Sequence, residues 1–309
     1  MSEASASSSS NRLKLWGVRG SIPVPGLATV RYGGNTTCAE VRADGEIIVL
    51  DAGSGIRELG LALENEFGSR AINLTLLITH VHWDHIQGFP FFVPSYNDKN
   101  QIQVFGYDGS DDGLQEILKG QMAVPFFPVA LYDLPGKVKI QQLNTMDFNI
   151  GKVHVRAKFV NHPGICVGYR VFTSKGSVAF LPDHEPYDAF KLHSVKSHLL
   201  SPEQTRKRAI EERAELVKFL HGSDILILDT QYTDEEYQSH VGWGHGSLST
   251  AISLALDAAV RKLILFHHDP THDDDYIDKM VQTARKLAAK SEAYLEIEGA
   301  REGAEMTIG

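Results

Sequence analysis

Four metal-ligand side chains within six positions constrain this chain more than any other feature of its sequence. They lie in the segment THVHWDHIQG, residues 79–88, directly after the strand-like apolar run 74–78. The cluster consists of His80, His82, Asp84 and His85. Imidazoles and carboxylates crowded into one turn repel each other or lose hydration unless a cation organises them. The segment therefore predicts half of a metal site.

The position of this cluster at the end of a strand predicts two metal ions. If the strand ends at Thr79, His80 and His82 leave it on the same side, whereas Asp84 and His85 lie on the following turn and point elsewhere. Open catalytic zinc sites usually hold three protein ligands and a water, so further ligands must come from later in the chain. Polar residues that follow buried strands are typical ligand-binding groups of α/β proteins. Three residues follow such hydrophobic runs: His162, Asp183 and His267.

Together with the turn VLDAGSG around Asp51, residues 49–55, these residues resemble the metallo-β-lactamase superfamily. Five motifs of that family occur here in order, and the resemblance covers about residues 13–300. It implies that the first metal ion is held by His80, His82 and His162, the second by Asp84, His85 and His267, and that Asp183 bridges them. It also implies that Asp51 lies behind the ligands. Zinc is expected as the divalent metal, with manganese and iron as alternatives, because mixed His/Asp sites accept each of them.

Single members of this set have simpler explanations. Taken alone, His162 or His267 would be an ordinary core or surface histidine, and His268 competes with His267 for the same role. Asp51 would serve equally well as a turn-forming residue that hydrogen-bonds its own backbone. Only the order of these residues relative to the cluster at 80–85 favours a metal site.

Length and composition favour one enzyme domain. A chain of 309 residues with 42% hydrophobic residues can bury a substantial core, and its widely spaced motifs must converge in one compact unit. The start MSEASASSSS predicts a disordered tail over residues 1–11 and a single domain over residues 12–309. No apolar run approaches the roughly 20 residues of a membrane span. Only two cysteines occur, Cys38 and Cys166, which favours a reducing, cytoplasmic location; neither is at a ligand position, which argues against the β-lactamase branch.

Hydrophobic periodicity predicts two similar halves. The expected strands cover residues 13–18, 38–41, 47–50, 74–78, 102–105, 153–159, 167–172, 178–181, 225–228, 263–266 and 293–297. The expected helices cover residues 55–67, 113–119, 204–220, 247–260 and 276–291. Strands followed by helices after the ligand-bearing loops are typical of an α/β fold of the αββα type, a four-layer metallo-β-lactamase sandwich with its site at the sheet edge between the halves.

The segment GWGHGS, residues 242–247, bears on the reaction. Its His245 stands between glycines at the start of an expected helix, where it could bind a phosphate oxygen or donate a proton to a leaving alkoxide. A simpler explanation is a helix-capping turn with an exposed histidine. The segment resembles the histidine motif of the phosphodiesterase group that contains ribonuclease Z and cyclic-nucleotide phosphodiesterases. That resemblance implies that His245 is a proton donor.

Three residues outside the ligand set are predicted to bind substrate. Two glycine-rich turns, residues 17–23 and 33–37, would permit close backbone approach to a phosphate, which Arg19 or Asn35 would contact. The alternative is that lone glycine turns are only turns. Trp243 would add a stacking surface for a nucleobase.

These features predict a dinuclear metal-dependent phosphodiesterase that acts on a small nucleotide, cyclic or linear. Two dications, two carboxylates and a bridging hydroxide leave a net charge of about +1, which favours an anionic phosphodiester over a neutral amide. The metal-bridging hydroxide would attack phosphorus, and Asp84 and His245 are the predicted catalytic residues.

The net charge of the chain indicates which kind of partner to expect. The net charge is -9 and no long basic arm is evident, which argues against a nucleic-acid partner. Residues 191–213 are locally basic but also carry glutamates, so we interpret them as a solvated helix or lid. A small-molecule nucleotide is therefore the expected partner, without a membrane, and the resemblance implies a homodimer.

Three alternatives stay open at this point. A thioester or lactone hydrolase would keep the ligands without depending on His245. A ribonuclease Z-like RNA-processing nuclease would bind its substrate with a steep salt dependence. A non-catalytic binding or redox protein would hold metal without turnover, and the unbroken ligand set argues against it.

Overall fold

The structure, a computed structural model, describes residues 11–107, 109, 113–187 and 201–309. Of the tail expected at residues 1–11, only Asn11 falls within this part of the chain. Its side chain is buried and hydrogen-bonds Asp44 and Ser174, so Asn11 belongs to the folded body and not to a tail. The single domain over residues 12–309 stays a prediction. Residues 191–200 of the segment interpreted as a helix or lid lie outside the described residues.

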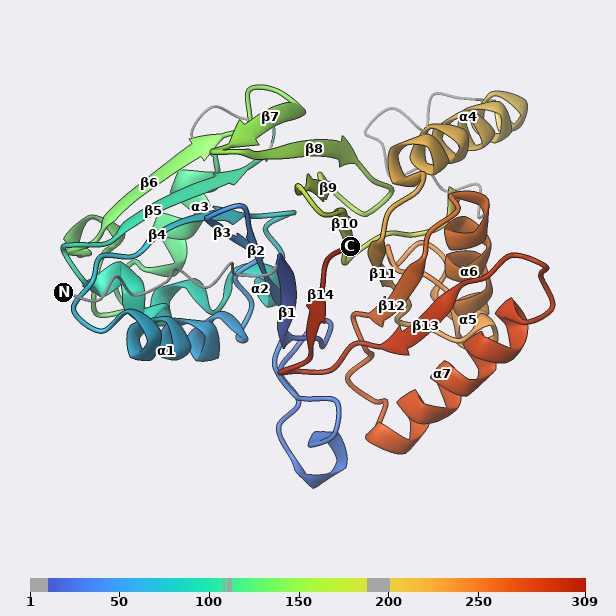
Figure 1. The fold of residues 1–309 in the computed structure, drawn as a ribbon, viewed down its shortest axis with the longest axis horizontal. Helices are drawn as coiled ribbons and strands as arrows, with labels where there is room; N and C mark the ends of the chain where they lie inside the picture. Colours follow the sequence, from blue (N-terminus) through green and yellow to red (C-terminus); the bar gives the residue numbers. More distant parts are fainter. Residues whose placement is uncertain (1–10, 108, 110–112, 188–200) are drawn as a thin grey trace, which may run out of the picture.

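Two seven-stranded mixed sheets form the centre of the molecule (Figure 1). Their strand orders are β14-β1-β2-β3-β4-β5-β6 and β13-β12-β11-β10-β9-β8-β7. The first sheet contains β1 (Arg12–Gly17), β2 (Cys38–Ala43), β3 (Glu46–Leu50), β4 (Asn73–Leu77), β5 (Gln101–Gly106), β6 (Lys137–Gln142) and β14 (Glu305–Thr307). The second contains β7 (Asp147–Ile150), β8 (Val153–Phe159), β9 (Val167–Phe172), β10 (Ser177–Leu181), β11 (Ile225–Asp229), β12 (Lys262–Phe266) and β13 (Glu296–Gly299).

Each sheet joins an antiparallel part to a parallel part. Strands β3 to β6 run parallel in the first sheet, and β10 to β13 run parallel in the second. Strands β14, β1, β2 and β3 pair antiparallel, as do β7, β8, β9 and β10. Because the carboxyl ends of parallel strands meet at one edge, the loops after them gather there.

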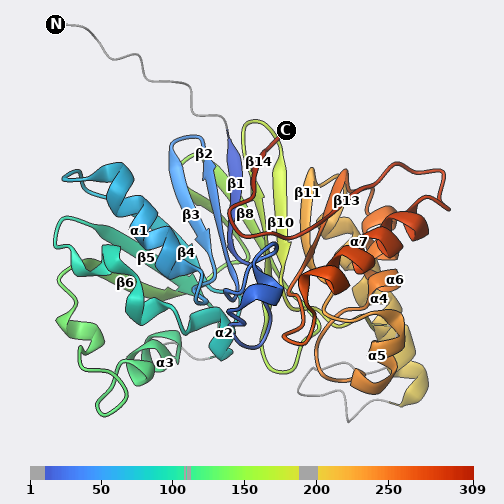
Figure 2. The ribbon, with the colours of Figure 1, turned by 90° about the horizontal axis from the view of Figure 1, so that it is seen from below.

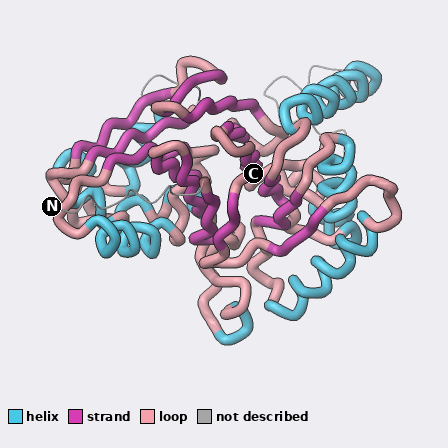
Figure 3. Tube along the Cα trace, in the orientation of Figure 1, coloured by secondary structure: helices cyan, strands magenta, loops and turns pink. Residues whose placement is uncertain are grey.

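Helices cover the outer face of each sheet and complete four layers (Figures 2 and 3). They are α1 (Ile56–Phe67), α2 (Trp83–Ile86), α3 (Gly113–Gln121), α4 (Pro202–Leu220), α5 (Asp234–His240), α6 (Leu248–Asp257) and α7 (Asp274–Ala288), with the short 3-10 helices η1 (Leu27–Thr29), η2 (Phe89–Phe91), η3 (Val93–Tyr96) and η4 (Leu131–Asp133). Buried clusters fill the space between the sheets, beneath α1 and α3, and beneath α4, α6 and α7. The predicted αββα sandwich is confirmed.

Strand β10 illustrates why these residues form layers. All of its side chains are buried. Because successive strand residues point to opposite faces, Val178 and Phe180 lie in the core between the sheets, whereas Ala179 and Leu181 lie in the core beneath the helices. A strand covered on both faces is apolar throughout, and each large side chain that it buries contributes roughly 1.5–3 kcal/mol.

Most elements lie within a few residues of their predicted bounds, and the differences concentrate at sheet edges. Strands β6, β7 and β14 are absent from the prediction, because short or lysine-rich edge strands such as KVKIQQ depend on their partner strand. Strand β13 begins at Glu296 rather than at residue 293. Helix α5 has no buried residue, so periodicity misses it, although its capping box of Thr233 and Glu236 was a usable signal. Within the described ranges, no helix is both long and apolar enough to cross a membrane.

Candidate active site

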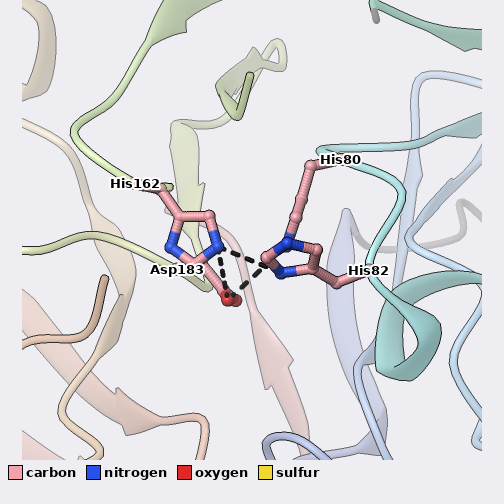
Figure 4. A group of neighbouring side chains, drawn as sticks. All are labelled: His80, His82, His162 and Asp183. Atoms are coloured by element: carbon pink, nitrogen blue, oxygen red, sulfur yellow. Dashed lines mark hydrogen bonds and ion pairs between the residues drawn. The ribbon is translucent and has the colours of Figure 1, made fainter. Parts of the chain in front are cut away.

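The loops after β4, β8 and β10 bring a first group of predicted ligands together. His80, His82, His162 and Asp183 point toward one another, and their ligand atoms all lie within 4.8 Å (Figure 4). Oδ2 of Asp183 lies 3.6 Å from Nε2 of His80 and 3.6 Å from Nε2 of His162. Nε2 of His162 lies 3.1 Å from Nδ1 of His82.

Asp84, His85 and His267 form a second group. His267 is the residue that follows β12. Oδ2 of Asp84 lies 3.3 Å from Nε2 of His85 and 3.1 Å from Nε2 of His267. The same two ring nitrogens lie 3.0 Å and 3.2 Å from Oδ1 of Asp183. Asp183 therefore presents one carboxylate oxygen to each group, which is the geometry that a bridging ligand requires.

The separations and the donor atoms fit two metal ions. Ligands about 2.1 Å from a tetrahedral ion lie about 3.4 Å from one another, close to the 3.0–3.6 Å separations within the two groups. Among the described residues, three buried atoms of these groups contact an oppositely charged atom but make no well-aligned hydrogen bond: Nε2 of His80, Nε2 of His85 and Oδ1 of Asp183. Buried polar atoms are rarely left without partners. Imidazole and carboxylate donors suit zinc, manganese and iron, so these residues can hold divalent cations.

Four of these residues have protonation states that suit metal binding as well. Burial lowers the pKa of His80 well below its usual value and that of His162 to about 4, so both rings offer a neutral nitrogen. Burial opposes the ionisation of Asp183, but His267 and neighbouring imidazoles hold the pKa of its carboxyl well below its usual range. The pKa of Asp84 is likewise lowered, because nearby imidazoles outweigh burial. Neutral imidazoles and ionised carboxylates are the forms that bind metal. His85 differs: burial opposes its protonation, but Asp183, Asp84 and Asp51 hold its pKa well above the usual value, so metal binding there would displace a proton.

Asp51 lies directly behind the second group. Its Oδ2 lies 2.8 Å from Nδ1 of His85, and its two carboxylate oxygens accept hydrogen bonds from N and Oγ1 of Thr79 at 2.7 Å and 2.8 Å. The side chain is buried, and the backbone has a left-handed φ of 62°, which aspartate tolerates. A carboxylate on the far ring nitrogen fixes the orientation and tautomer of an imidazole. Asp51 thus supports His85, and the hydrogen bonds of its carboxylate run to Thr79 and His85.

Two comparable supports were not identified from the sequence. Oε1 of Gln231 lies 2.9 Å from Nδ1 of His267, and the carbonyl oxygen of Gly244 lies 2.8 Å from Nδ1 of His162. Gln231 follows the end of β11, and that position was its only sequence signal. The Gly244 carbonyl had none, since every residue carries such an acceptor.

His245 lies beside both groups and is held by Asp229, the last residue of β11. Its Nδ1 lies 2.9 Å from Oδ2 of Asp229, and its ring stacks on His267 with the centroids 4.9 Å apart. Burial alone would lower the pKa of His245, but Asp229, aided by Asp183 and Asp84, raises it to about 9. A protonated imidazole in this position can serve as a general acid.

Trp243 lies two residues before His245, and 62% of its surface is exposed. It meets the ring of His240 edge-on at 4.8 Å, and His240 stacks on Tyr232 at 4.4 Å. This array fixes one side of an exposed aromatic surface near the candidate acid. A stacking role for Trp243 stays a prediction.

The predicted phosphate contact of Arg19 is wrong. Its side chain is fully buried and donates hydrogen bonds to the carbonyl oxygens of Gly33 at 2.8 Å, His272 at 2.6 Å and Asp269 at 3.2 Å. A 4.0 Å ion pair with Asp274 accompanies them. Arg19 therefore ties the first glycine turn to the loop after β12.

A substrate contact of Asn35 stays a prediction. Its Nδ2 donates to Glu302 at 3.1 Å and its Oδ1 accepts from Ser54 at 3.0 Å, so the side chain also ties the second glycine turn to neighbouring segments. The first glycine turn approaches a predicted ligand: a Cβ on Gly20 would lie 2.4 Å from the ring of His267. Close backbone approach to a phosphate stays a prediction.

Arg19→Met is expected to lower the free energy of unfolding by about 3–5 kcal/mol. The substitution leaves the carbonyl oxygens that accept from Arg19 without their donor, and it leaves the buried carboxylate of Asp274 without this cation. Chemical denaturation measures this effect, and the exposed Arg57→Met is the matched control, with a change within about 0.5 kcal/mol. The Michaelis constant of the folded variant should stay unchanged. A small stability change with a large rise in that constant would instead restore a substrate role for Arg19.

Sequence comparison identifies relatives that share the name ribonuclease Z, while no protein-family model matches the chain. Ribonuclease Z of Pyrococcus horikoshii is 23% identical over 266 residues, which cover 77% of this chain and 82% of the relative. That of Thermoplasma acidophilum is 24% identical over 302 residues, which cover 89% of this chain and 91% of the relative.

Solved structures show the same fold. Unliganded yeast PDE1 has a TM-score of 0.66 at 16% identity and covers 97% of this chain and 99% of its own. The short form of human tRNase Z has a TM-score of 0.61 at 16% identity and covers 96% and 99%. A metallo-β-lactamase fold protein of Bacillus subtilis, YhfI, has a TM-score of 0.64 at 16% identity and covers 96% and 99%.

These relatives correct the expectation that argued against a nucleic-acid partner. That expectation came from the net charge of -9, yet the proteins named above include ribonucleases. Binding to RNA depends on local cation clusters and not on the charge of the whole chain, so the argument was wrong. Zinc, a homodimer and a cytoplasmic location stay predictions.

The predicted resemblance to the metallo-β-lactamase superfamily is confirmed by relatives and fold together. The relatives align over most of this chain, and the matching structures share its fold with TM-scores of 0.61 to 0.66. In sequence and in fold, the chain is therefore similar to the metallo-β-lactamase superfamily and, within it, to ribonuclease Z and related phosphodiesterases.

Proposed function

We propose that this chain hydrolyses phosphodiester bonds in nucleotides with two divalent metal ions, for which zinc is expected. One ion would be held by His80, His82 and His162, the other by Asp84, His85 and His267, with Asp183 between them. The ligand separations and the three buried atoms without a well-aligned hydrogen bond support this assignment. When bound, the two ions would supply an activated water and neutralise charge on the phosphoryl oxygens.

The pair of His245 and Asp229 beside the two ligand groups is the observation that carries this proposal. Asp229 accepts from Nδ1 of His245, which leaves Nε2 to give a proton to the departing ribose oxygen. An alkoxide is a poor leaving group without such an acid. A thiolate needs no such help, since thiols ionise near pH 8.5, so the pair favours a phosphodiester over a thioester.

The preferred substrate in this proposal is a small nucleotide, cyclic or linear, whose base stacks on exposed Trp243. An RNA phosphodiester is the second candidate, and the relatives named ribonuclease Z favour it. Both substrates present the same bond to the same residues. They differ in how much binding energy comes from contacts with distant phosphates.

A turnover screen of the metal-loaded protein tests the proposal. Its substrates are bis-para-nitrophenyl phosphate, a panel of cyclic and linear dinucleotides, transfer RNA transcripts and an acyl thioester. We expect hydrolysis of phosphodiesters and none of the thioester. Tight RNA binding that falls steeply between 50 and 200 mM salt would select RNA. Thioester turnover without phosphodiester turnover would refute the proposal.

A further inference from the structure

Glu185 is a fully buried carboxylate two residues after Asp183 that the reaction described above does not use. Its Oε1 accepts hydrogen bonds from the backbone N of Gly242 at 2.5 Å and from the hydroxyl of Tyr237 at 3.0 Å. Its Oε2 accepts from the backbone N of Gly244 at 3.1 Å. The side chain therefore holds the glycine loop, residues 242–246, from within the protein.

The same loop contacts the ligand His162. The carbonyl of Gly244 accepts from Nδ1 of His162 at 2.8 Å. Gly244 has a φ of 96°, and a Cβ there would lie 2.5 Å from Nδ1 of His162 and 2.2 Å from Cδ of Pro163. Only glycine lets the loop approach so closely. A shift of this loop would therefore change the orientation of the ligand.

The loop also carries the candidate acid. His245 lies between Gly244 and Gly246, and a Cβ on Gly246 would lie 2.5 Å from the carbonyl oxygen of Asp229. The loop is thus packed against His162 at one end and Asp229 at the other. Glu185 accepts hydrogen bonds from the backbone N–H groups of Gly242 and Gly244, on the side of the loop that contacts His162.

The glycine loop resembles a site for an anion, and Glu185 fills it. Gly242 and Gly244 have φ values of 93° and 96°, and backbone N–H groups in such turns form a concavity that binds negative charge. Because Glu185 occupies these donors, they are not free for a substrate phosphate. The negative charge of the concavity is supplied by the protein itself.

We propose that Glu185 is a positioning residue that fixes the orientations of both the His162 ring and the His245 ring, because it holds the glycine loop that contacts one and carries the other. It thereby couples the metal affinity of the first ligand group to proton donation by His245. This inference rests on the proposed function for the role of His245, but its metal-affinity part does not require turnover. A carboxylate is needed because both of its oxygens must accept from N–H donors.

Glu185→Gln tests this proposal, because the amide keeps the shape but turns one acceptor into a donor that faces an N–H group. We expect zinc affinity, measured by chelator competition, to fall about 10- to 100-fold, the usual effect of losing a residue that orients a ligand. Turnover should fall more for an alkyl phosphodiester than for bis-para-nitrophenyl phosphate, because only the alkyl ester needs the acid. Glu40→Gln is the control: Glu40 on β2 is also buried and accepts hydrogen bonds from Trp16 and Arg42.

Wild-type zinc affinity and a wild-type ratio of the two rates in folded Glu185→Gln would overturn the proposal, as would the same losses in Glu40→Gln. Should Glu185→Gln fail to fold, Tyr237→Phe removes one contact to the carboxylate and is expected to shift both measurements in the same direction by a smaller amount. No shift would again overturn it. If the wild type hydrolyses no phosphodiester, the proposed function fails, while zinc affinity still decides the role of Glu185.

Discussion

Asp183→Asn is expected to lower phosphodiester turnover by about 1,000-fold or more and to reduce the bound metal from two ions per chain to one or none. One carboxylate oxygen of Asp183 faces His80 and His162, and the other faces His85 and His267. An amide offers only one oxygen, so one group would face an N–H donor. Losing several kcal/mol of charge stabilisation accounts for the magnitude, since each 1.4 kcal/mol is tenfold in rate.

Asp44→Asn is the matched control for this experiment. Asp44 bonds Asn11 and Ser174 in a turn with a left-handed φ of 54°, where asparagine is well tolerated. Metal content by mass spectrometry and turnover should match the wild type in this variant. Two tightly bound ions and unimpaired turnover in Asp183→Asn would contradict the bridging role.

His245→Ala is expected to lower turnover of an alkyl phosphodiester by about 100- to 10,000-fold, the usual contribution of a general acid. The loss should be about tenfold or less for bis-para-nitrophenyl phosphate, whose leaving group departs without a proton. Rates on the two esters, compared at saturating substrate, measure this difference. His154→Ala is the control. His154 is an exposed residue of β8, and its ring lies 2.6 Å from the carboxylate of the surface residue Asp147.

The metal content of His245→Ala distinguishes a general acid from a metal ligand. His245 also lies with Asp183 and His267 in a group whose ligand atoms are within 4.8 Å of one another. If His245 bound metal, its removal would lower the metal content and slow both esters equally. That result would contradict the role of an acid.

The ligand set could be predicted because its residues are recognisable one by one. Each of His162, Asp183 and His267 follows an apolar run, and the order of these runs fixes which strand ends meet. The residues that orient the ligands and the candidate acid could not be predicted in this way. Asp229 and Gln231 meet their histidines through tertiary packing, and no local pattern in the sequence encodes that choice of partner.

The error at Arg19 has a similar origin. A glycine turn next to an arginine is typical of a phosphate site, but the same pattern permits close packing against another loop. Which of the two occurs depends on the loop after β12, about 250 positions later in the chain. Edge strands such as β14 were not predicted for the same reason, because pairing with a neighbouring strand determines whether they form.

A crystal structure of the zinc-loaded protein with anomalous diffraction at the zinc edge tests the central claim most directly. We expect two peaks, one between His80, His82 and His162 and the other between Asp84, His85 and His267. Each should lie about 2.0–2.2 Å from its ligand atoms, with one oxygen of Asp183 on each ion. A single peak, or zinc bound elsewhere with these side chains unliganded, would contradict the account.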